Sequence, residues 1–443
     1  MSVLSSSSGP ALLLRSLHRR RACAGYLLKF SARPLLLRAL DSPVMQRFYL
    51  DDNATTNLDP RVRAVMEPLL AAPLGNPSSL HAEGRRARGE IDAARDAIAA
   101  WLKGKPSEII FTSGGTESCN LAVHGLALAH QEKGRHLITA KTEHHAVLHA
   151  FAALERKADF EVTYLDVNAG GLIDPDDLAR AIRPDTVLVS IMSANNETGV
   201  RQPKREIGEI CAKRKVLFHT DAIQSAGKEE IDLAGWQVSS LSLTAHKMHG
   251  PLGAGLLWLK SGVPIARLME GGSHENERRP GTENAPAIAG FAEAVRLYGN
   301  VDRTEAIRQG RWTEGLWIEL DSLGGVRRNG DEMLRIDNTL NVSFLGLQGE
   351  DLLIGLDLAG LAVSSGSACL VGSVQPSHVL AAMGVPAEWA SATVRFSIGP
   401  HIRDEDLTEI ARRVRQVVTH QRALRGWTPD ESCGKLVRHE VLA

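Results

Sequence analysis

The sequence has few cysteines, and their spacing excludes the common cysteine-based scaffolds. No pair has C-x-x-C spacing, and the total of five is odd; they are Cys23, Cys119, Cys211, Cys369 and Cys433. We therefore expect neither a disulfide framework nor a zinc site, and one of these thiols is a candidate reactive group.

Long apolar runs and an excess of one charge are also missing. No uninterrupted apolar stretch reaches the roughly 18 residues of a membrane span. The 51 lysines and arginines nearly balance the 52 acidic residues, and the hydrophobic content of 43% is ordinary for a globular chain. We expect no membrane partner and no nucleic acid, and 443 residues suffice for two domains.

Acidic residues are absent before Asp41, although the same stretch carries seven arginines or lysines among serines and leucines. This composition is typical of an organelle-import leader. An upstream start codon or a disordered tail, with translation beginning at Met45, fits the composition as well. We expect a cytoplasmic bacterial protein, or a mitochondrial one if residues 1–45 are a true transit peptide.

From Arg47 onwards, β-like apolar runs alternate with stretches of helical period, which predicts an α/β fold with a mostly parallel sheet. The expected strands of the large domain are 108–112, 136–140, 161–165, 186–193, 216–220, 238–243 and 255–259. The expected helices are 61–72, 81–102, 120–129, a long charged one from about 300–306, and 404–424, with further strands near 338–345 and 392–398. We predict a large domain over 61–302, a smaller one built from 46–60 and 303–443, and an N-terminal extension over 1–45.

Residues 239–258 place a lysine in a polar turn between two apolar strands. Lys247 follows Thr244 and His246 there, and the second strand begins at Gly255. A lysine beside a hydroxyl and an imidazole suits the Schiff base that anchors pyridoxal phosphate. Taken alone, a solvated surface lysine explains the turn equally well.

Two other segments fit the same cofactor. The loop 113–118 leads from a strand into a helix, and its Gly115 and Thr116 suit a phosphate cradle at the helix N-terminus. Asp221 ends an apolar strand, where ligands bind in open α/β sheets, and its carboxylate could pair with the pyridine nitrogen. An ordinary glycine turn and a helix N-cap are the alternatives for these two features.

Three further positions are candidates for the chemistry itself. Asn196 follows a strand in an Asn-Asn pair that could bind a phenolic oxygen or a carboxylate, or only form a turn. His144 follows another strand and could stack on the ring and move protons. His145 and His149 have metal-ligand spacing, yet no third ligand accompanies them, so we expect no metal. Cys369 lies in a loop of small residues that cannot pack a core, so we expect an exposed nucleophile.

With these residues in place, the chain resembles a cysteine desulfurase of the iron–sulfur-cluster or nitrogenase type, within the fold-type-I pyridoxal-phosphate superfamily (aminotransferase class V). The similarity runs from Phe48 to about Ile410. It rests on the segments 49–56, 75–79, 113–118, 142–144, 195–199, 221–224, 246–247, 279–282, 364–369 and 392–397. The resemblance implies a seven-stranded, mostly parallel sheet in a large domain and a smaller α+β domain.

The resemblance also implies roles for individual residues. Lys247 would form the Schiff base, Asp221 would pair with the ring nitrogen, and His144 would stack on the ring. The phosphate would be bound by Gly115, Thr116, Thr244 and His246. The phenolic oxygen would contact Gln224 and Asn196, and the substrate carboxylate would contact Arg395. Thr282 would reach the phosphate of the other subunit in a homodimer, and Cys369 would take the sulfur.

The implied reaction removes sulfur from L-cysteine, giving L-alanine and a persulfide on Cys369 that is donated to iron–sulfur scaffold proteins or other sulfur acceptors. A selenocysteine lyase and a plain aminotransferase are alternatives on the same scaffold, and Cys369 argues against the second. A catalytically silent scaffold protein is an alternative of another class. The set of Lys247, Asp221 and His144 argues against it.

Overall fold

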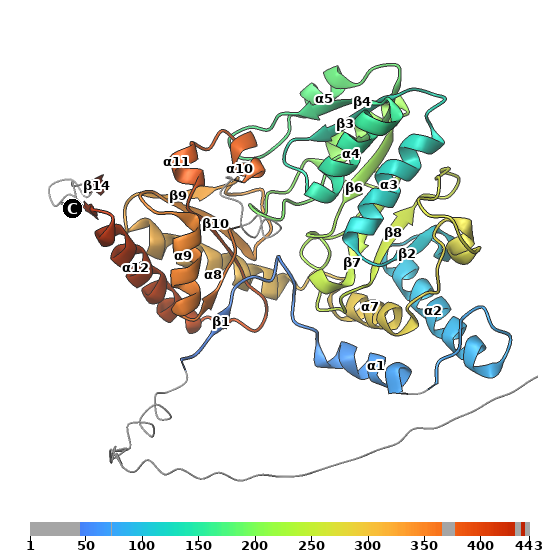
Figure 1. Cartoon of the computed structure of the whole chain (residues 1–443), viewed down its shortest axis with the longest axis horizontal. Coiled ribbons are helices and arrows are strands. Elements are labelled where there is room, and N and C mark those ends of the chain that lie inside the picture. Colours follow the sequence, from blue (N-terminus) through green and yellow to red (C-terminus); the bar gives the residue numbers. More distant parts are fainter. Residues whose placement is uncertain (1–44, 72, 366–376, 430–435, 439–443) are drawn as a thin grey trace, which may run out of the picture. The chain divides into compact units, whose positions relative to one another are not determined.

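The protein is described from a computed structural model that covers residues 45–71, 73–365, 377–429 and 436–438. Residues 46–443 group into one compact unit. Buried hydrophobic clusters cover the two faces of a seven-stranded sheet, and together we call them the first core. A second core surrounds a three-stranded sheet, and Figure 1 shows the two sheets in separate parts of the unit. In the described part of the chain, no helix is long and apolar enough to cross a membrane.

The seven-stranded sheet confirms the predicted fold class. Its order is β2 (Ile109–Thr112), β8 (Gly255–Leu259), β7 (Ser240–Thr244), β6 (Leu217–Asp221), β5 (Thr186–Ser190), β3 (His136–Ala140) and β4 (Glu161–Leu165). The strands from β7 to β4 run parallel, whereas β8 is antiparallel to both of its neighbours. Most of these strands are buried at every position, as expected for a sheet that helices cover on both faces.

The helices divide between the two faces because successive strand residues point in opposite directions. Phe111 of β2 packs in the core with the helices α1 (Pro60–Ala71), α2 (Ala82–Trp101) and α7 (Ala285–Tyr298). Its neighbour Ile110 packs on the other face with α3 (Gly115–Ala129) and α4 (His145–Ala158). The two shorter helices of this region are α5 (Pro175–Ala181) and α6 (Lys204–Arg214).

The second core surrounds an antiparallel sheet in the order β12 (Thr393–Ser397), β10 (Thr339–Phe344) and β9 (Val326–Asn329). The helices α8 (Arg303–Asp321), α9 (Gly349–Leu358) and α12 (Asp406–Leu424) pack against it. The strand β1 (Phe48–Tyr49) pairs in parallel with β11 (Leu361–Ala362), and Phe48 and Leu50 are buried in this core. The remaining elements are the short helices α10 (His378–Ala382) and α11 (Ala387–Ala390) and the hairpin of β13 (Trp427–Pro429) with β14 (Leu436–Arg438). The domain limits 61–302 and 46–60 plus 303–443 stay a prediction.

Several element boundaries differ from the sequence-based expectation by one or two residues, and two differ by more. The helix expected from Asn120 begins at Gly115, so the glycine-rich loop supplies the first turn of α3. Gly114, just before it, has a φ of 157°, which only glycine adopts easily. The strand expected over 186–193 ends at Ser190, and residues 191–199 continue from its carboxyl end as mostly irregular chain.

Candidate active site

A cavity of about 280 Å³ lies at the carboxyl ends of the parallel strands, between the two cores. Its position agrees with the rule that open α/β sheets bind ligands at this edge. Ten of the predicted site residues line it: Gly115, Thr116, His144, Asn196, Asp221, Gln224, Thr244, His246, Lys247 and Arg395. Thr282 is exposed and does not line the cavity of its own chain. Cys369 lies outside the described residues.

Lys247 is held against the segment that connects β1 to α1. It lies in a single 3-10 turn, Ala245–Lys247, directly after β7. Its Nζ donates to the carbonyl oxygens of Asn53 at 2.5 Å and Ala54 at 2.6 Å. The amide of Thr56 donates to the carbonyl of His246 at 2.9 Å, which fixes this segment beside the turn. The amine therefore points into the cavity from a rigid support.

Asp221 is a buried carboxylate at the end of β6, only 4% exposed. Its Oδ1 accepts from the amide of Ile223 at 3.0 Å, and its Oδ2 accepts from the Sγ of Cys119 at 3.5 Å. Among the described residues no lysine, arginine or histidine forms an ion pair with it. Burial raises the pKa of Asp221, while the nearby His144 and Lys247 oppose the rise. A cationic ring N–H is the partner that this carboxylate lacks.

His144 precedes α4 and faces the same cavity. Its Nδ1 accepts from the amide of Ala146 at 3.1 Å, as a helix N-cap does. Burial lowers the pKa of His144. The neutral imidazole therefore carries its proton on Nε2, the nitrogen left for a ligand.

Glu143, just before His144, is fully buried behind the cavity wall. Its Oε1 accepts from the amide of Met192 at 2.6 Å, and Oε2 has no partner within the described ranges. Burial raises the pKa of Glu143 well above its ordinary value, and the hydrogen bond from the amide of Met192 opposes the rise.

The opposite end of the cavity suits a phosphate. Gly115 and Thr116 lie in the first turn of α3, where the backbone amides have no acceptor inside the helix and attract a negatively charged ligand. Gly115 also lies so close to Ile223 that a Cβ would come within 2.3 Å of its Cδ1. Thr244 and His246 add a hydroxyl and an imidazole to this end. Burial lowers the pKa of His246 to about 4, so it is neutral at neutral pH.

Arg395 approaches from β12 of the second sheet and is 1% exposed. Its Nη2 donates to Asp51 Oδ1 at 2.6 Å, and its Nη1 donates to the carbonyl of Asn196 at 2.9 Å. The guanidinium is thus preorganised at the cavity wall beside Asn196.

Sequence reasoning missed several residues of this cavity. Asn53 and Ala54 supply the carbonyls that hold Lys247, and Glu197 and His378 also line the wall. His378 follows the cysteine loop, and its Nε2 donates to the carbonyl of Glu143 at 2.9 Å. The signal for Asn53 was its place in the motif 49–56, whereas nothing local to His378 marks it as a cavity residue.

These features fit pyridoxal phosphate. The cavity joins a preorganised amine, an uncompensated buried carboxylate and a helix N-terminus, which correspond to the aldehyde, the ring nitrogen and the phosphate of that cofactor. Among the described residues, no group of three or more histidine, cysteine or acidic side chains is arranged to hold a metal ion.

Comparisons with known proteins agree with this geometry. The family model described as Aminotransferase class-V matches residues 48–410. "Cysteine desulfurase IscS" of Dictyoglomus turgidum is 45% identical over 81% of this chain and 91% of its own length. "Cysteine desulfurase IscS" of an Anaeromyxobacter species is 46% identical over 86% of this chain and 94% of its own length.

Solved structures show the same relationship. A structure described as "NIFS-LIKE PROTEIN" superposes with a TM-score of 0.80 at 34% identity, covering 85% of this chain and all of its own. A second, described as "SspA in complex with cysteine", has a TM-score of 0.71 at 35% identity and covers 80% of this chain and 99% of its own.

Proposed function

Because this chain belongs to the aminotransferase class-V family and, within it, to the cysteine desulfurases, we propose that it removes sulfur from L-cysteine, releases L-alanine and collects the sulfur on Cys369. The cofactor of this activity is pyridoxal phosphate. The observation that carries the residue assignment is the cavity in which Lys247 lies with the uncompensated Asp221 and with His144.

In this proposal each end of the cavity binds one part of the cofactor. Lys247 would hold the aldehyde end of the cofactor, and Asp221 would face the ring nitrogen and favour its protonated form. The phosphate would be bound by Gly115, Thr116, Thr244 and His246. The phenolic oxygen would accept hydrogen bonds from Gln224 and Asn196. When bound, the cofactor supplies an electron sink for the negative charge that develops on the substrate.

Arg395 binds the substrate carboxylate in a bidentate manner, and Asn196 lies beside it. Its bond to Asp51 holds the guanidinium plane in position. His144 would stack on the cofactor ring, and its Nε2 is the ring nitrogen available to a ligand because the amide of Ala146 donates to Nδ1. Burial lowers the pKa of His144, so an imidazolium formed there would give up its proton readily.

Cys369 Sγ attacks the sulfur of the bound cysteine. The new S–S bond forms as the Cβ–S bond of the substrate breaks, and the bonding pair remains on carbon, which takes up a proton on the way to alanine. Ser364, which precedes the segment of Cys369, and His378, which follows it, support this role for Cys369. The amide of Arg395 donates to the carbonyl of Ser364 at 2.6 Å, and His378 lines the cavity itself.

We also propose that the protein is a homodimer whose active sites lie at the subunit interface. Thr282 is exposed on its own chain, and the segment that carries it is tied to α3 through Arg279, which donates to Glu117 at 2.7 Å. The segment is thus fixed while Thr282 is available to the phosphate of a second copy. Sulfur acceptors are iron–sulfur scaffold proteins or other sulfur-accepting proteins.

Mass spectrometry of the thiols after incubation with L-cysteine tests the central assignment. Cys369→Ser should bind cysteine with a change in the visible absorption of the holoenzyme, yet hold no persulfide and form alanine at less than about 1% of the normal rate. Cys433→Ser is the matched control and should retain both. A persulfide on Cys433, or normal alanine formation by Cys369→Ser, would overturn the assignment.

L-selenocysteine as a substrate distinguishes a cysteine desulfurase from a selenocysteine lyase. A selenocysteine lyase need not capture selenium covalently, so Cys369→Ser would then turn over L-selenocysteine at the normal rate. A desulfurase with Cys369 as its acceptor predicts that wild-type protein releases alanine from L-cysteine and that this substitution prevents it.

A further inference from the structure

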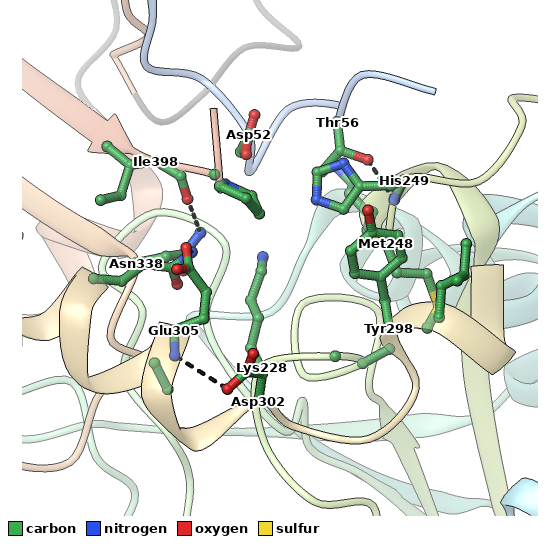
Figure 2. Close-up of a pocket in the computed structure, with 18 of the residues that line it drawn as sticks. Asp52, Thr56, Lys228, Met248, His249, Tyr298, Asp302, Glu305, Asn338 and Ile398 are labelled. Carbon is green, nitrogen blue, oxygen red and sulfur yellow. Dashed lines mark hydrogen bonds between the residues drawn. The ribbon is translucent and has the colours of Figure 1, made fainter. Parts of the chain in front are cut away.

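A second cavity, of about 390 Å³, adjoins the cofactor cavity at Lys247. Lys247 lines both cavities, and Lys228 lines only the second. Figure 2 shows the Lys228 side chain extending between Asn338 and Met248 toward Asp52. A lysine at this position faces the back of the site, where none of the proposed steps uses it.

The ammonium of Lys228 is bound by amides and not by a carboxylate. Its Nζ donates to Gln224 Oε1 at 2.9 Å and to Asn53 Oδ1 at 3.1 Å, and no acidic side chain within the described residues lies within 4.0 Å of it. Burial lowers the pKa of Lys228 to about 7. The nearby Asp52 opposes this fall without forming an ion pair with Lys228. Burying a cation with so little compensation is unfavourable, so packing alone does not account for this lysine.

The contact with Lys228 decides which way the Gln224 amide faces. An ammonium only donates, so the atom beside it must be the carbonyl oxygen Oε1 and the NH2 group must point away. The Nε2 of Gln224 donates one hydrogen to the carbonyl of Asn53 at 2.9 Å. Its second N–H is left for the cofactor cavity, which Gln224 lines.

Asn53 is oriented by the same ammonium. Its Oδ1 accepts from Lys228 and from Asn338 Nδ2 at 3.3 Å, and its Nδ2 donates to Thr339 Oγ1 at 2.8 Å. The backbone carbonyl of Asn53 is in turn an acceptor for Lys247 Nζ. One buried ammonium therefore fixes two residues that touch the site.

We propose that Lys228 is a positioning residue, which orients the amide of Gln224 toward the phenolic oxygen of the cofactor and keeps Asn53 against Lys247. The inference rests on the proposed contact of Gln224 with that oxygen. Lys228 itself touches neither the cofactor nor the substrate.

Binding of pyridoxal phosphate to the cofactor-free full-length chain, followed by its visible absorption band, tests this role without turnover. Lys228→Met should weaken binding about tenfold, the contribution of one hydrogen bond from Gln224 to the phenolic oxygen, and should shift the band. Lys228→Arg should restore both, because a guanidinium donates to two oxygens and the second cavity has room for it.

The double variant shows whether Lys228 acts through Gln224. Gln224→Ala should weaken binding and shift the band like Lys228→Met, and the combined substitutions should cost clearly less than the sum of the two single losses. Lys204→Met is the matched control: Lys204 is a buried lysine outside the site, paired with Glu229 at 2.9 Å. It should lower the melting temperature and leave the binding constant and the band unchanged.

Each outcome of these measurements tests either the role of Lys228 or the contact of Gln224. If Gln224→Ala leaves both readouts unchanged, its contact with the phenolic oxygen is wrong and the positioning role falls with it. If Gln224→Ala changes them and Lys228→Met does not, only the role of Lys228 is wrong. Fully additive losses in the double variant also overturn it. Should Lys228→Met fail to fold, Lys228→Gln, whose shorter amide cannot donate to both oxygens at once, gives the same comparison.

Discussion

Two buried carboxylates, Glu275 and Asp221, differ in what compensates them. Glu275 accepts from Arg95 at 2.6 and 2.9 Å and from the amide of Phe111 at 3.0 Å. Within the described part of the chain, Asp221 accepts only from the amide of Ile223 and the thiol of Cys119. A charge that the chain neutralises itself has a structural role, whereas one left without a cation is prepared for a ligand.

The surroundings of the two carboxylates support this distinction. Glu275, Asn276 and Glu277 have φ values of 49°, 55° and 63°, a left-handed turn that is unfavourable for residues other than glycine. The ion pair with Arg95 holds this turn against β2. Asp221, in contrast, lies in regular β-structure and needs no such support.

Breaking the Glu275 pair should have the largest effect on stability. Glu275→Gln leaves Arg95 without its charge partner in a largely buried position, and we expect the free energy of unfolding to fall by about 3–5 kcal/mol. Urea denaturation measures it. The exposed pair of Arg63 with Glu67 is the control, because Glu67→Gln should change stability by less than about 1 kcal/mol. Equal losses in the two variants would contradict the structural role of Glu275.

Asp221→Asn should show the opposite pattern, with activity lost and the fold retained. The amide still accepts from Ile223 but does not favour a protonated ring nitrogen as a carboxylate does. We expect alanine formation to slow about 100-fold, equivalent to about 2.7 kcal/mol in the barrier. The melting temperature of the cofactor-free protein should stay the same or rise. Normal turnover would place the essential carboxylate elsewhere.

Asp52 provides the smallest and most specific test, through the pH dependence of stability. Its Oδ1 has no hydrogen-bond partner among the described residues, and burial raises the pKa of Asp52 from 3.8 to about 6. Between these values the native state binds more protons than the unfolded chain, so stability should fall as the pH rises from about 4 to about 6.

Asp52→Asn should remove this loss, which we expect to be about 2 kcal/mol. Thermal unfolding of the cofactor-free protein across this pH range measures it. The exposed Glu132→Gln is the control and should leave the pH dependence as it is. A wild-type slope retained in Asp52→Asn would mean that another group titrates.

Much of the fold could be predicted from local sequence because its signals are local. β3, β4 and β8 have the predicted limits, since apolar runs bounded by polar turns mark buried strands. The start of α3 could not be predicted in this way. Gly114 and Gly115 suggested a loop, but packing beside Ile223 draws Gly115 into the helix.

The sequence by itself determined which residue types are available for the chemistry, because strand ends and glycine-rich turns mark Lys247, Asp221, His144 and Thr116 without any knowledge of the fold. Only the tertiary structure decided which groups bind these side chains or neutralise their charges. Asn53, Lys228 and Arg395 come from segments up to 344 residues away from their partners, and no local pattern encodes such contacts. Whether a buried charge finds a counter-ion depends on which distant segments pack beside it, and that difference separates Glu275 from Asp221.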